Sequence, residues 1–349
     1  MEKRNVYLLI SFLLFIFVFS ISSSARIITI VTDPMGTGTY AATAGVAKII
    51  NQYNDVDLIV KVKPMTGSLE IAGQLATGEG QLGVHNSFDA KFSWLTKGPE
   101  FGVYDEVNKV TPLRLIFGGA ITFSTALTHE QTGIKTGADL KGRKFVGEIT
   151  GGAIDTAQSI AFLKSWGLEK EDVIWMRVPG LTDAVYLLIE GIAEATGSNG
   201  PGPAVVNELD AKKGAFFISI NPTPEGIQAF RDNYPWDVDI VEVDPDPRLT
   251  GVKEKIWMIK FTDYYMARVD LVSDDEAYGI IKAVWEHVDE LRELHSTLNF
   301  ILEPKYLIIR NQTVPYHPGV IQFFKDQGVW DQELEDQNNM LLDLEAEEM

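Results

Sequence analysis

The stretch TDPMGTGTYAATAGVAKIINQYN, residues 32–54, follows the apolar run IITIVT and decides the fold class. The apolar run, residues 27–32, is typical of a buried strand, whereas the apolar residues after the turn recur at helical spacing. The alternation continues, with a strand predicted at 56–64, a helix at 66–79 and a strand at 80–87. This βαβαβ order implies a parallel sheet with right-handed crossovers.

The turn inside this stretch, rich in glycine and hydroxyl groups, lies where ligands gather on a parallel sheet, at the carboxyl end of a strand. Gly36 and Gly38 let backbone N–H groups approach a ligand, and Thr37, Thr39 and Tyr40 add hydroxyl groups. Such a turn at a helix N-terminus suits a carboxylate, because unpaired N–H groups and the helix dipole favour negative charge. The alternative is that Thr39 only caps the helix and the glycines only turn the chain.

A second group of polar residues follows the third predicted strand. Asn86 and Ser87 can donate or accept hydrogen bonds at the same edge of the sheet, so we expect them to contact the ligand. For His85, a structural role and a ligand contact are equal alternatives. Phe88 is expected to fill the core rather than to stack on a ligand.

The second half of the chain repeats the pattern of strand, glycine turn and helix. Thr150, Gly151, Gly152 and Ala153 are expected to lie at the start of a long helix, whose N-terminus can again hold an anion. Asp155 falls in the first turn of that helix, where it favours the dipole and is interpreted as structural. If Asp155 faced the cleft instead, it would repel a carboxylate or attract an ammonium group.

A third turn follows a later strand of this half. Ser198 and Asn199 are candidates to reach the ligand, while Gly200 shapes the turn. A rigid turn without ligand contact is an equal alternative for this segment. No arginine falls in any of the three turns, so backbone amides would carry the recognition of an anion.

The repeated pattern predicts two α/β lobes with parallel-type sheets flanked by helices, the type II-like architecture of periplasmic binding proteins. Lobe 1 is predicted to be discontinuous, with residues 26–118 and 251–349, and lobe 2 spans 119–250. Two long apolar runs, at 113–129 and 255–270, are long enough to cross between the lobes. A ligand held in the cleft between hinged lobes is hidden from water when they close.

The first 25 residues are typical of a secretory signal peptide. Lys3 and Arg4 form a basic start, residues 6–20 are apolar, and Ser23 and Ala25 suit cleavage after Ala25. The alternative is an uncleaved membrane anchor, for which the apolar run is short. Cleavage predicts a secreted, periplasmic protein.

Composition excludes several classes of function. The formal net charge of −19 over 349 residues argues against binding to nucleic acid or to anionic lipid surfaces. The chain has no cysteine, which excludes disulfides, thiol chemistry and a lipid-anchored N-terminal cysteine. The acidic last residues, 335–349, are expected to form a solvated or frayed tail.

Several segments together resemble the TAXI-type solute receptors of tripartite ATP-independent periplasmic (TRAP) transporters. They run in the order of that family over nearly all of the chain after the signal peptide. The segments are GTGTYAATAGVAKIIN (36–51), MTGSLEIAGQLATGEGQLGVHNS (65–87), TGIKTGADLKGRKFVGEITGGAIDTAQSIAFLKSWGL (132–168), AVYLLIEGIAEATGSNGPGPAVVNEL (184–209) and VPYHPGVIQFFKDQG (314–328).

The resemblance implies a receptor without catalysis or cofactor. Such a receptor would deliver a small organic anion or amino acid, glutamate-like or dicarboxylate-like, to the membrane permease of a TRAP transporter. Two rival functions stay open: a periplasmic ligand-sensing partner of a signalling receptor and, less favoured, a periplasmic enzyme. The enzyme is less favoured because the sequence contains neither G-x-S-x-G nor H-E-x-x-H, and its histidines are scattered, which also predicts no metal site.

Overall fold

The computed structural model describes residues 25–95, 110–234, 238–294 and 307–349. The basic and apolar regions of the predicted signal peptide lie outside these residues. Within the described part of the chain, no helix is both long and apolar enough to span a membrane.

The first half of the chain forms the predicted βαβαβ unit. Its elements are β1 (Arg26–Thr32), α2 (Gly38–Tyr53), β2 (Leu58–Pro64), α3 (Ser68–Thr77) and β3 (Leu82–Asn86). Strand β1 pairs in parallel with both β2 and β3, which confirms the sequence prediction of a parallel sheet here. The carboxyl ends of β1 and β3 therefore lie at one edge.

The second half contains a matching unit. It consists of β5 (Lys144–Ile149), α5 (Ala153–Ser165), β6 (Ile174–Val178), α6 (Leu181–Glu190) and β7 (Ala195–Asn199). Strand β5 lies between β6 and β7 and is parallel to both. The turn that precedes α5 is therefore placed beside the carboxyl end of β7.

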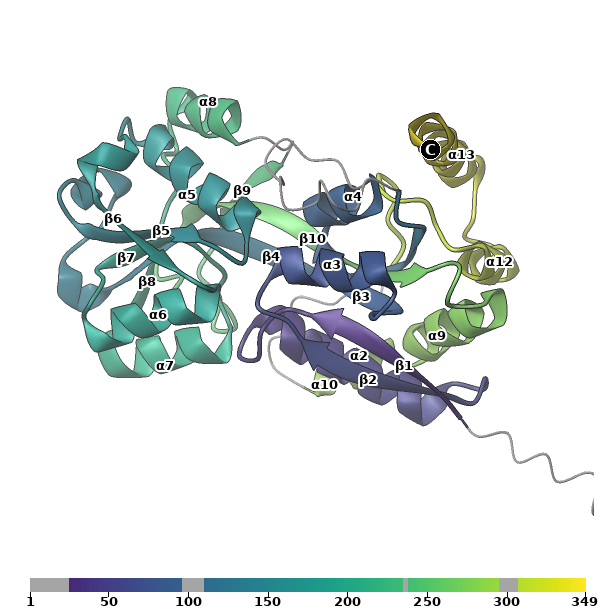
Figure 1. Cartoon of the computed structure of the whole chain (residues 1–349). Coiled ribbons are helices and arrows are strands. Elements are labelled where there is room, and N and C mark those ends of the chain that lie inside the picture. The colour runs from purple at the N-terminus through teal and green to yellow at the C-terminus, as the bar shows by residue number, and fades with distance from the viewer. Residues whose placement is uncertain (1–24, 96–109, 235–237, 295–306) are drawn as a thin grey trace, which may run out of the picture.

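Two long strands join the two units. They are β4 (Leu113–His129) and β10 (Ile256–Arg268), which pair antiparallel and run side by side between the lobes (Figure 1). The sheet order is β2-β1-β3-β10-β4-β7-β5-β6, with β8 (Ala215–Ile218) on β4 and β9 (Asp239–Val243) on β10. The sheet is thus mixed, because its central strands are antiparallel. The register between β10 and β4 shifts between Thr262 and Tyr264.

Helices cover the sheet on each side of this central pair. The remaining α-helices are α4 (Ser87–Leu95), α7 (Ala204–Lys213), α8 (Pro224–Asn233), α9 (Asp274–Glu286), α10 (Val288–Glu293), α12 (Pro318–Asp326) and α13 (Gln332–Glu348). Short 3-10 turns occupy Glu130–Thr132, Gly137–Leu140 and Lys170–Asp172.

The expectation of a solvated C-terminal tail is wrong. The tail forms α13, which buries Leu334 and Leu341 against lobe 1. Glu345 accepts a hydrogen bond from Trp94 Nε1 at 3.0 Å and forms an ion pair with Arg114 at 2.6 Å. The many acids of the tail hide the helical spacing of its few apolar residues.

The two ends of each crossing strand belong to different hydrophobic cores. The core of lobe 1 includes Phe117 of β4 and Tyr264 of β10, whereas the cores of lobe 2 include Ala126 and Ile259 of the same strands. We therefore propose that both lobe boundaries lie inside these strands. The predicted boundary at 118/119 falls within β4, but that at 250/251 falls before β10, whose first half pairs with β9 of lobe 2.

Candidate ligand-binding site

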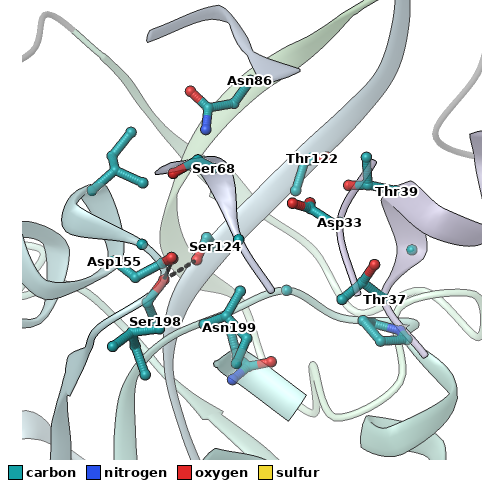
Figure 2. A pocket seen from close by; sticks show the side chains of 18 of the residues that line it. Asp33, Thr37, Thr39, Ser68, Asn86, Thr122, Ser124, Asp155, Ser198 and Asn199 are labelled. Carbon is teal, nitrogen blue, oxygen red and sulfur yellow. Dashed lines mark hydrogen bonds between the residues drawn. The ribbon is translucent and has the colours of Figure 1, made fainter. Parts of the chain in front are cut away.

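A cavity of about 140 Å³ lies where the two lobes meet. Its lining comes from the turns after β1, β3, β5 and β7, and from the crossing strands β4 and β10. Figure 2 shows these side chains around one space, with Asp155 and Ser198 on one side and Asp33 and Thr39 on the other. The cavity thus draws on both lobes and on the strands that connect them.

Most of the predicted ligand contacts line this cavity. They are Thr37, Gly38, Thr39, Asn86, Gly151, Gly152, Ser198, Asn199 and Gly200. The three turns meet because the carboxyl ends of their strands face one another across the cavity.

Four predicted contacts lie outside the lining: Gly36, Tyr40, Ser87 and Thr150. Gly36 has a φ of 94° and serves the turn itself. Thr150 is drawn away to β6, where its backbone N–H donates to Val178 O at 3.0 Å. One more predicted contact, Ala153, begins α5, and its side chain is outside the described part of the structure.

Thr37, rather than Thr39, caps helix α2. The Thr37 hydroxyl accepts a hydrogen bond from Tyr40 N at 3.2 Å and donates to Pro34 O at 2.8 Å. Thr39 is free for another role, and its hydroxyl donates to Asp263 Oδ2 at 3.3 Å. The cap predicted for this turn therefore exists, but on the neighbouring threonine.

Four aspartates line the cavity; the sequence prediction missed three of them and interpreted the fourth, Asp155, as structural, with a place in the cleft as the alternative. They are Asp33 after β1, Asp89 on α4, Asp155 on α5 and Asp263 on β10. Asp89 and Asp263 are each 3% exposed. One signal was available in the sequence: Asp263 interrupts the otherwise apolar centre of IWMIKFTDYYMAR.

Burial raises the pKa of every one of these carboxyl groups. Desolvation raises the pKa of Asp33 to about 6 and the pKa values of Asp89 and Asp155 to about 7 each. The pKa of Asp263 lies well above its ordinary value, first through burial and then through the charge of Asp33. The negative charge of Asp33 also raises the pKa of Asp89 and of Asp155, so the four groups interact electrostatically.

The aspartates hold few hydrogen bonds relative to their acceptor capacity. Ser198 Oγ donates to Asp155 Oδ1 at 2.7 Å (Figure 2), and Asn86 Nδ2 donates to Asp89 Oδ2 at 2.7 Å. The other oxygen of Asp89 is buried and has no hydrogen-bond partner among the described residues, and the same is true of Asn199 Nδ2. Buried polar atoms without partners carry a free-energy penalty that a bound ligand can remove.

The described residues offer the cavity no cationic side chain. Neither lysine nor arginine occurs in its described lining, and its histidine is neutral because burial lowers the pKa of His85 to about 3. His85 Nε2 lies 2.9 Å from Ser93 Oγ of α4. His85 is thus buried and bonded to α4 while it also lines the cavity, so both alternatives for its role stay open.

The lobes touch each other directly over the cavity. A Cβ atom added to Gly67, just before α3, would lie 2.1 Å from Gly151 O in the turn before α5. A Cβ on Gly151 would in turn lie 2.9 Å from Thr66 O. Backbone meets backbone here, so both positions exclude any side chain while the lobes are in contact.

Comparisons with known proteins agree with this architecture. The sequence model of a family described as NMT1-like matches residues 30–328. No match was found among curated proteins. A binding protein component of an ABC phosphonate transporter from Pseudomonas aeruginosa is similar in structure, with a TM-score of 0.50 and 9% identity, over 93% of this chain and 98% of the other.

A second similar structure is a protein from Bordetella bronchiseptica RB50, with a TM-score of 0.50 and 14% identity. The match covers 90% of this chain and 97% of the Bordetella chain. At these identities the likeness concerns the fold, and it confirms the predicted two-lobed α/β architecture of periplasmic binding proteins.

Proposed function

This chain belongs to the NMT1-like family, and on that premise we propose that it is an extracytoplasmic solute-binding receptor of a membrane transporter. It captures a small organic solute between its lobes and presents the closed form to the permease. The observation that carries the proposal is the polar cavity built jointly by both lobes and by the strands that join them.

The size of the cavity supports a small solute. An engineered protein cavity of roughly 150 Å³ accommodates benzene, and the present cavity is about 140 Å³. The space therefore suits a molecule of about the size of an amino acid or a short-chain acid. Of the two classes implied by the resemblance, an amino acid carries an ammonium group that suits the acidic lining, whereas a plain organic anion does not.

Closure of the hinge is the change by which the receptor would signal to the transporter that a solute is bound. A ligand favours the closed form only to the extent that it binds that form more tightly than the open one. Contacts from opposite lobes, such as Asp33 and Asp155, can form at the same time only when the cleft is closed. The closed surface would then be the form that the transporter recognises.

The resemblance to TAXI-type receptors leads us to propose a TRAP permease as the partner. The Pseudomonas protein of similar fold serves an ABC transporter, so the transporter class is a separate question from solute binding. Vesicles carrying a TRAP permease, with the receptor added outside, would take up the solute if the proposal is right. Uptake that depends instead on ATP hydrolysis would reject the TRAP assignment.

We propose that the protein has no catalytic activity. A serine nucleophile needs a general base within hydrogen-bond reach. Ser198 Oγ does donate to the Asp155 carboxyl group, but a carboxylate is a weak base for a serine hydroxyl. Among the described residues, the other side-chain hydrogen bonds of Ser198 and Ser124 join them to each other and to Gln158, and none joins them to a histidine or lysine. Conversion of a bound solute by the purified protein would contradict this part of the proposal.

The first experiment is a thermal-shift screen of the purified protein against amino acids, amines, dicarboxylates, oxo-acids and sugars. A solute at about 100 times its Kd adds about 2.7 kcal/mol to the free energy of unfolding. A hit that also makes the protein more compact in small-angle X-ray scattering supports the receptor. A protein that binds no solute but binds a sensor domain would favour the signalling alternative. Fractionation of cells tests the proposed periplasmic location and cleavage after Ala25.

A further inference from the structure

The cavity gathers four acidic side chains from four separate elements. Asp33, Asp89, Asp155 and Asp263 all line one space of about 140 Å³, and the described lining holds no cationic side chain that could neutralise them. A cluster of acids is common on protein surfaces, but here two of the four are almost completely buried. Something other than the described residues must therefore balance this charge when the acids ionise.

A second observation points to a missing hydrogen-bond donor. Asp89 Oδ1 is buried and has no hydrogen-bond partner within bonding distance among the described residues, although the nearby Ser68 hydroxyl lowers the pKa of this carboxyl group. Oδ2 of the same group is held by Asn86. Asp89 lines the cavity, yet only 3% of its surface is exposed to solvent. A ligand N–H group placed in the cavity would supply the donor that this oxygen lacks.

On the basis of the proposed receptor function, we propose that the solute carries a cationic N–H group, a primary ammonium or a guanidinium. Asp89 Oδ1 accepts a hydrogen bond from this group, and Asp33, Asp155 and Asp263 surround it with negative charge. Asn199 Nδ2, which is buried and unpartnered among the described residues, donates to an acceptor elsewhere on the same solute.

An inorganic cation fits the site less well. No group of three or more potential ligand residues within the described part of the chain lies close enough to hold a metal ion. The acids are instead spread around the cavity on both lobes. An organic cation with several N–H donors can reach separated carboxylates that a single ion cannot.

An anion would have to use the helix N-termini, and neither is well suited to one. The Thr37 side chain caps α2. At α5, Asp155 Oδ2 lies 2.1 Å from the position of a Cβ on Gly152, so this carboxyl group folds back over the first turn. At α2 the Thr37 hydroxyl thus already accepts from one of the N–H groups, that of Tyr40, and at α5 the negative charge of Asp155 would repel an anion.

The dependence of affinity on pH separates a cation from an anion. Among the residues that the structure describes, the titratable groups that line the site are the four aspartates, His85 and Tyr234. His85 stays neutral above about pH 3, and burial keeps the pKa of Tyr234 well above 10. A cation displaces protons from the aspartates, so its affinity rises with pH through the range of their pKa values, by up to about tenfold per pH unit for each proton released. An anion held by protonated aspartates shows the opposite slope.

The test is isothermal titration of the purified protein at pH 5.5 and pH 7.5 with 1,4-diaminobutane, agmatine, lysine, choline, glutarate, glutamate and 1,4-butanediol. We expect an amine or guanidinium compound to bind at least tenfold more tightly at pH 7.5, with release of protons measured in two buffers of different ionisation enthalpy. Choline, which has no N–H donor, is expected to bind at least tenfold more weakly than the best amine.

Binding of glutarate that strengthens at pH 5.5, with no binding of amines, would overturn the inference and leave the receptor intact. Binding of 1,4-butanediol alone, or of no amine or guanidinium compound at either pH, would overturn it as well. The receptor function itself fails only if the wider solute screen also gives no binder. The two proposals are therefore distinguishable.

Variants locate the charge that is recognised. Asp89→Asn and Asp155→Asn keep the shape of the side chain, and each is expected to weaken binding of the amine at least tenfold at pH 7.5. The matched control is Asp336→Asn, on the exposed face of α13, which is expected to change affinity less than twofold. If a cavity variant does not fold, the proton release by the unmodified protein still decides the question.

Discussion

The two glycine turns that meet at the cavity have similar sequence patterns but differ in the space around their glycines and in how the following helix is capped. In lobe 1, a Cβ on Gly36 or Gly38 would have no neighbouring atom within 4 Å, and the Thr37 side chain caps α2. In lobe 2, Gly151 is pressed against backbone, and α5 has no side-chain cap at Gly152. The first turn is open and capped by a hydroxyl; the second is tight and lies beneath a carboxylate.

This difference teaches that a glycine turn before a helix does not by itself define an anion site. The N–H groups at a helix start are available to a ligand only if the protein has not already satisfied them. Thr37 does so in one lobe and Asp155 lies over the other. Gly151 of the second turn serves the contact between the lobes.

The largest expected effect breaks the contact made by the tight turn. Gly67→Ala places a methyl group against Gly151 O, while the φ of 169° at this position is compatible with alanine. The closed form is then obstructed by backbone, so we expect affinity for the solute to fall at least tenfold, or about 1.4 kcal/mol. Titration calorimetry measures the affinity, and small-angle scattering with ligand reports whether the protein still closes.

The unfolding temperature of the unliganded variant serves as its control and is expected to change little. An unchanged affinity in Gly67→Ala would mean that binding does not require the contact between Gly67 and Gly151. The open and closed forms would then have to differ elsewhere.

The next effect compares the acids beside the two turns. The folded protein binds more protons than the unfolded chain between about pH 4 and pH 7, because the pKa values of Asp33 and Asp155 are raised. The free energy of unfolding therefore falls as pH rises through this window, at up to about 1.4 kcal/mol per unit of pKa shift. Stability from the protonated acids is present at pH 4 and lost at pH 8.

We expect Asp33→Asn and Asp155→Asn each to stabilise the unliganded protein by about 1–3 kcal/mol at pH 8 and by little at pH 4. Urea unfolding at the two pH values measures the difference. A gain in one lobe only would show that the acids beside the two turns are not equivalent. Equal gains at both pH values would contradict the assigned pKa shifts.

A smaller effect tests the cap of the open turn. Thr37→Ala removes the acceptor for Tyr40 N and should lower the free energy of unfolding by about 1 kcal/mol. Thr37→Ser keeps the hydroxyl group and should retain most of the stability. Thermal unfolding of the three proteins at one pH tests this, and an identical loss in the serine variant would assign the effect to the methyl group.

The smallest effect concerns the space around the open turn. Gly38→Ala adds a methyl group at the start of α2 with no neighbour within 4 Å. We expect a gain of about 0.5 kcal/mol, because alanine restricts the unfolded chain more than glycine does. A clear destabilisation, measured by urea unfolding, would show that the turn is as tight as its counterpart in lobe 2.

The sequence was sufficient for the fold because its signals are local. Apolar runs and helical spacing predicted the elements on both sides of the cavity, and their order predicted the parallel units. The lobe boundary near β10 and the C-terminal helix were less accessible. The first depends on pairing between β10 and β9, and the second on a distant partner, since Glu345 meets Trp94 and Arg114 only in three dimensions.

The sequence predicted where the candidate site lies but did not predict that it is acidic. The ends of the strands bring Thr39, Asn86 and Ser198 to the cavity, and their contact with a ligand stays a prediction. The acidic character was missed because Asp33, Asp89 and Asp263 occur far apart in the sequence and resemble ordinary surface or capping acids. Whether an aspartate is buried, and beside which other aspartate, is a property of tertiary packing.

The register shift in β10 has a mechanical consequence for the cavity. Asp263 sits at that shift, in the ribbon of two strands that joins the lobes, whereas Asp33 and Asp155 sit on the lobes. We expect this ribbon to be the axis of the hinge. A force on a group at the axis of rotation has almost no lever arm, and the same force at a distance from the axis produces torque. We therefore expect Asp263 to hold a solute in the same place in the open and closed forms, while attraction to Asp33 and Asp155 supplies the torque that shuts the cleft.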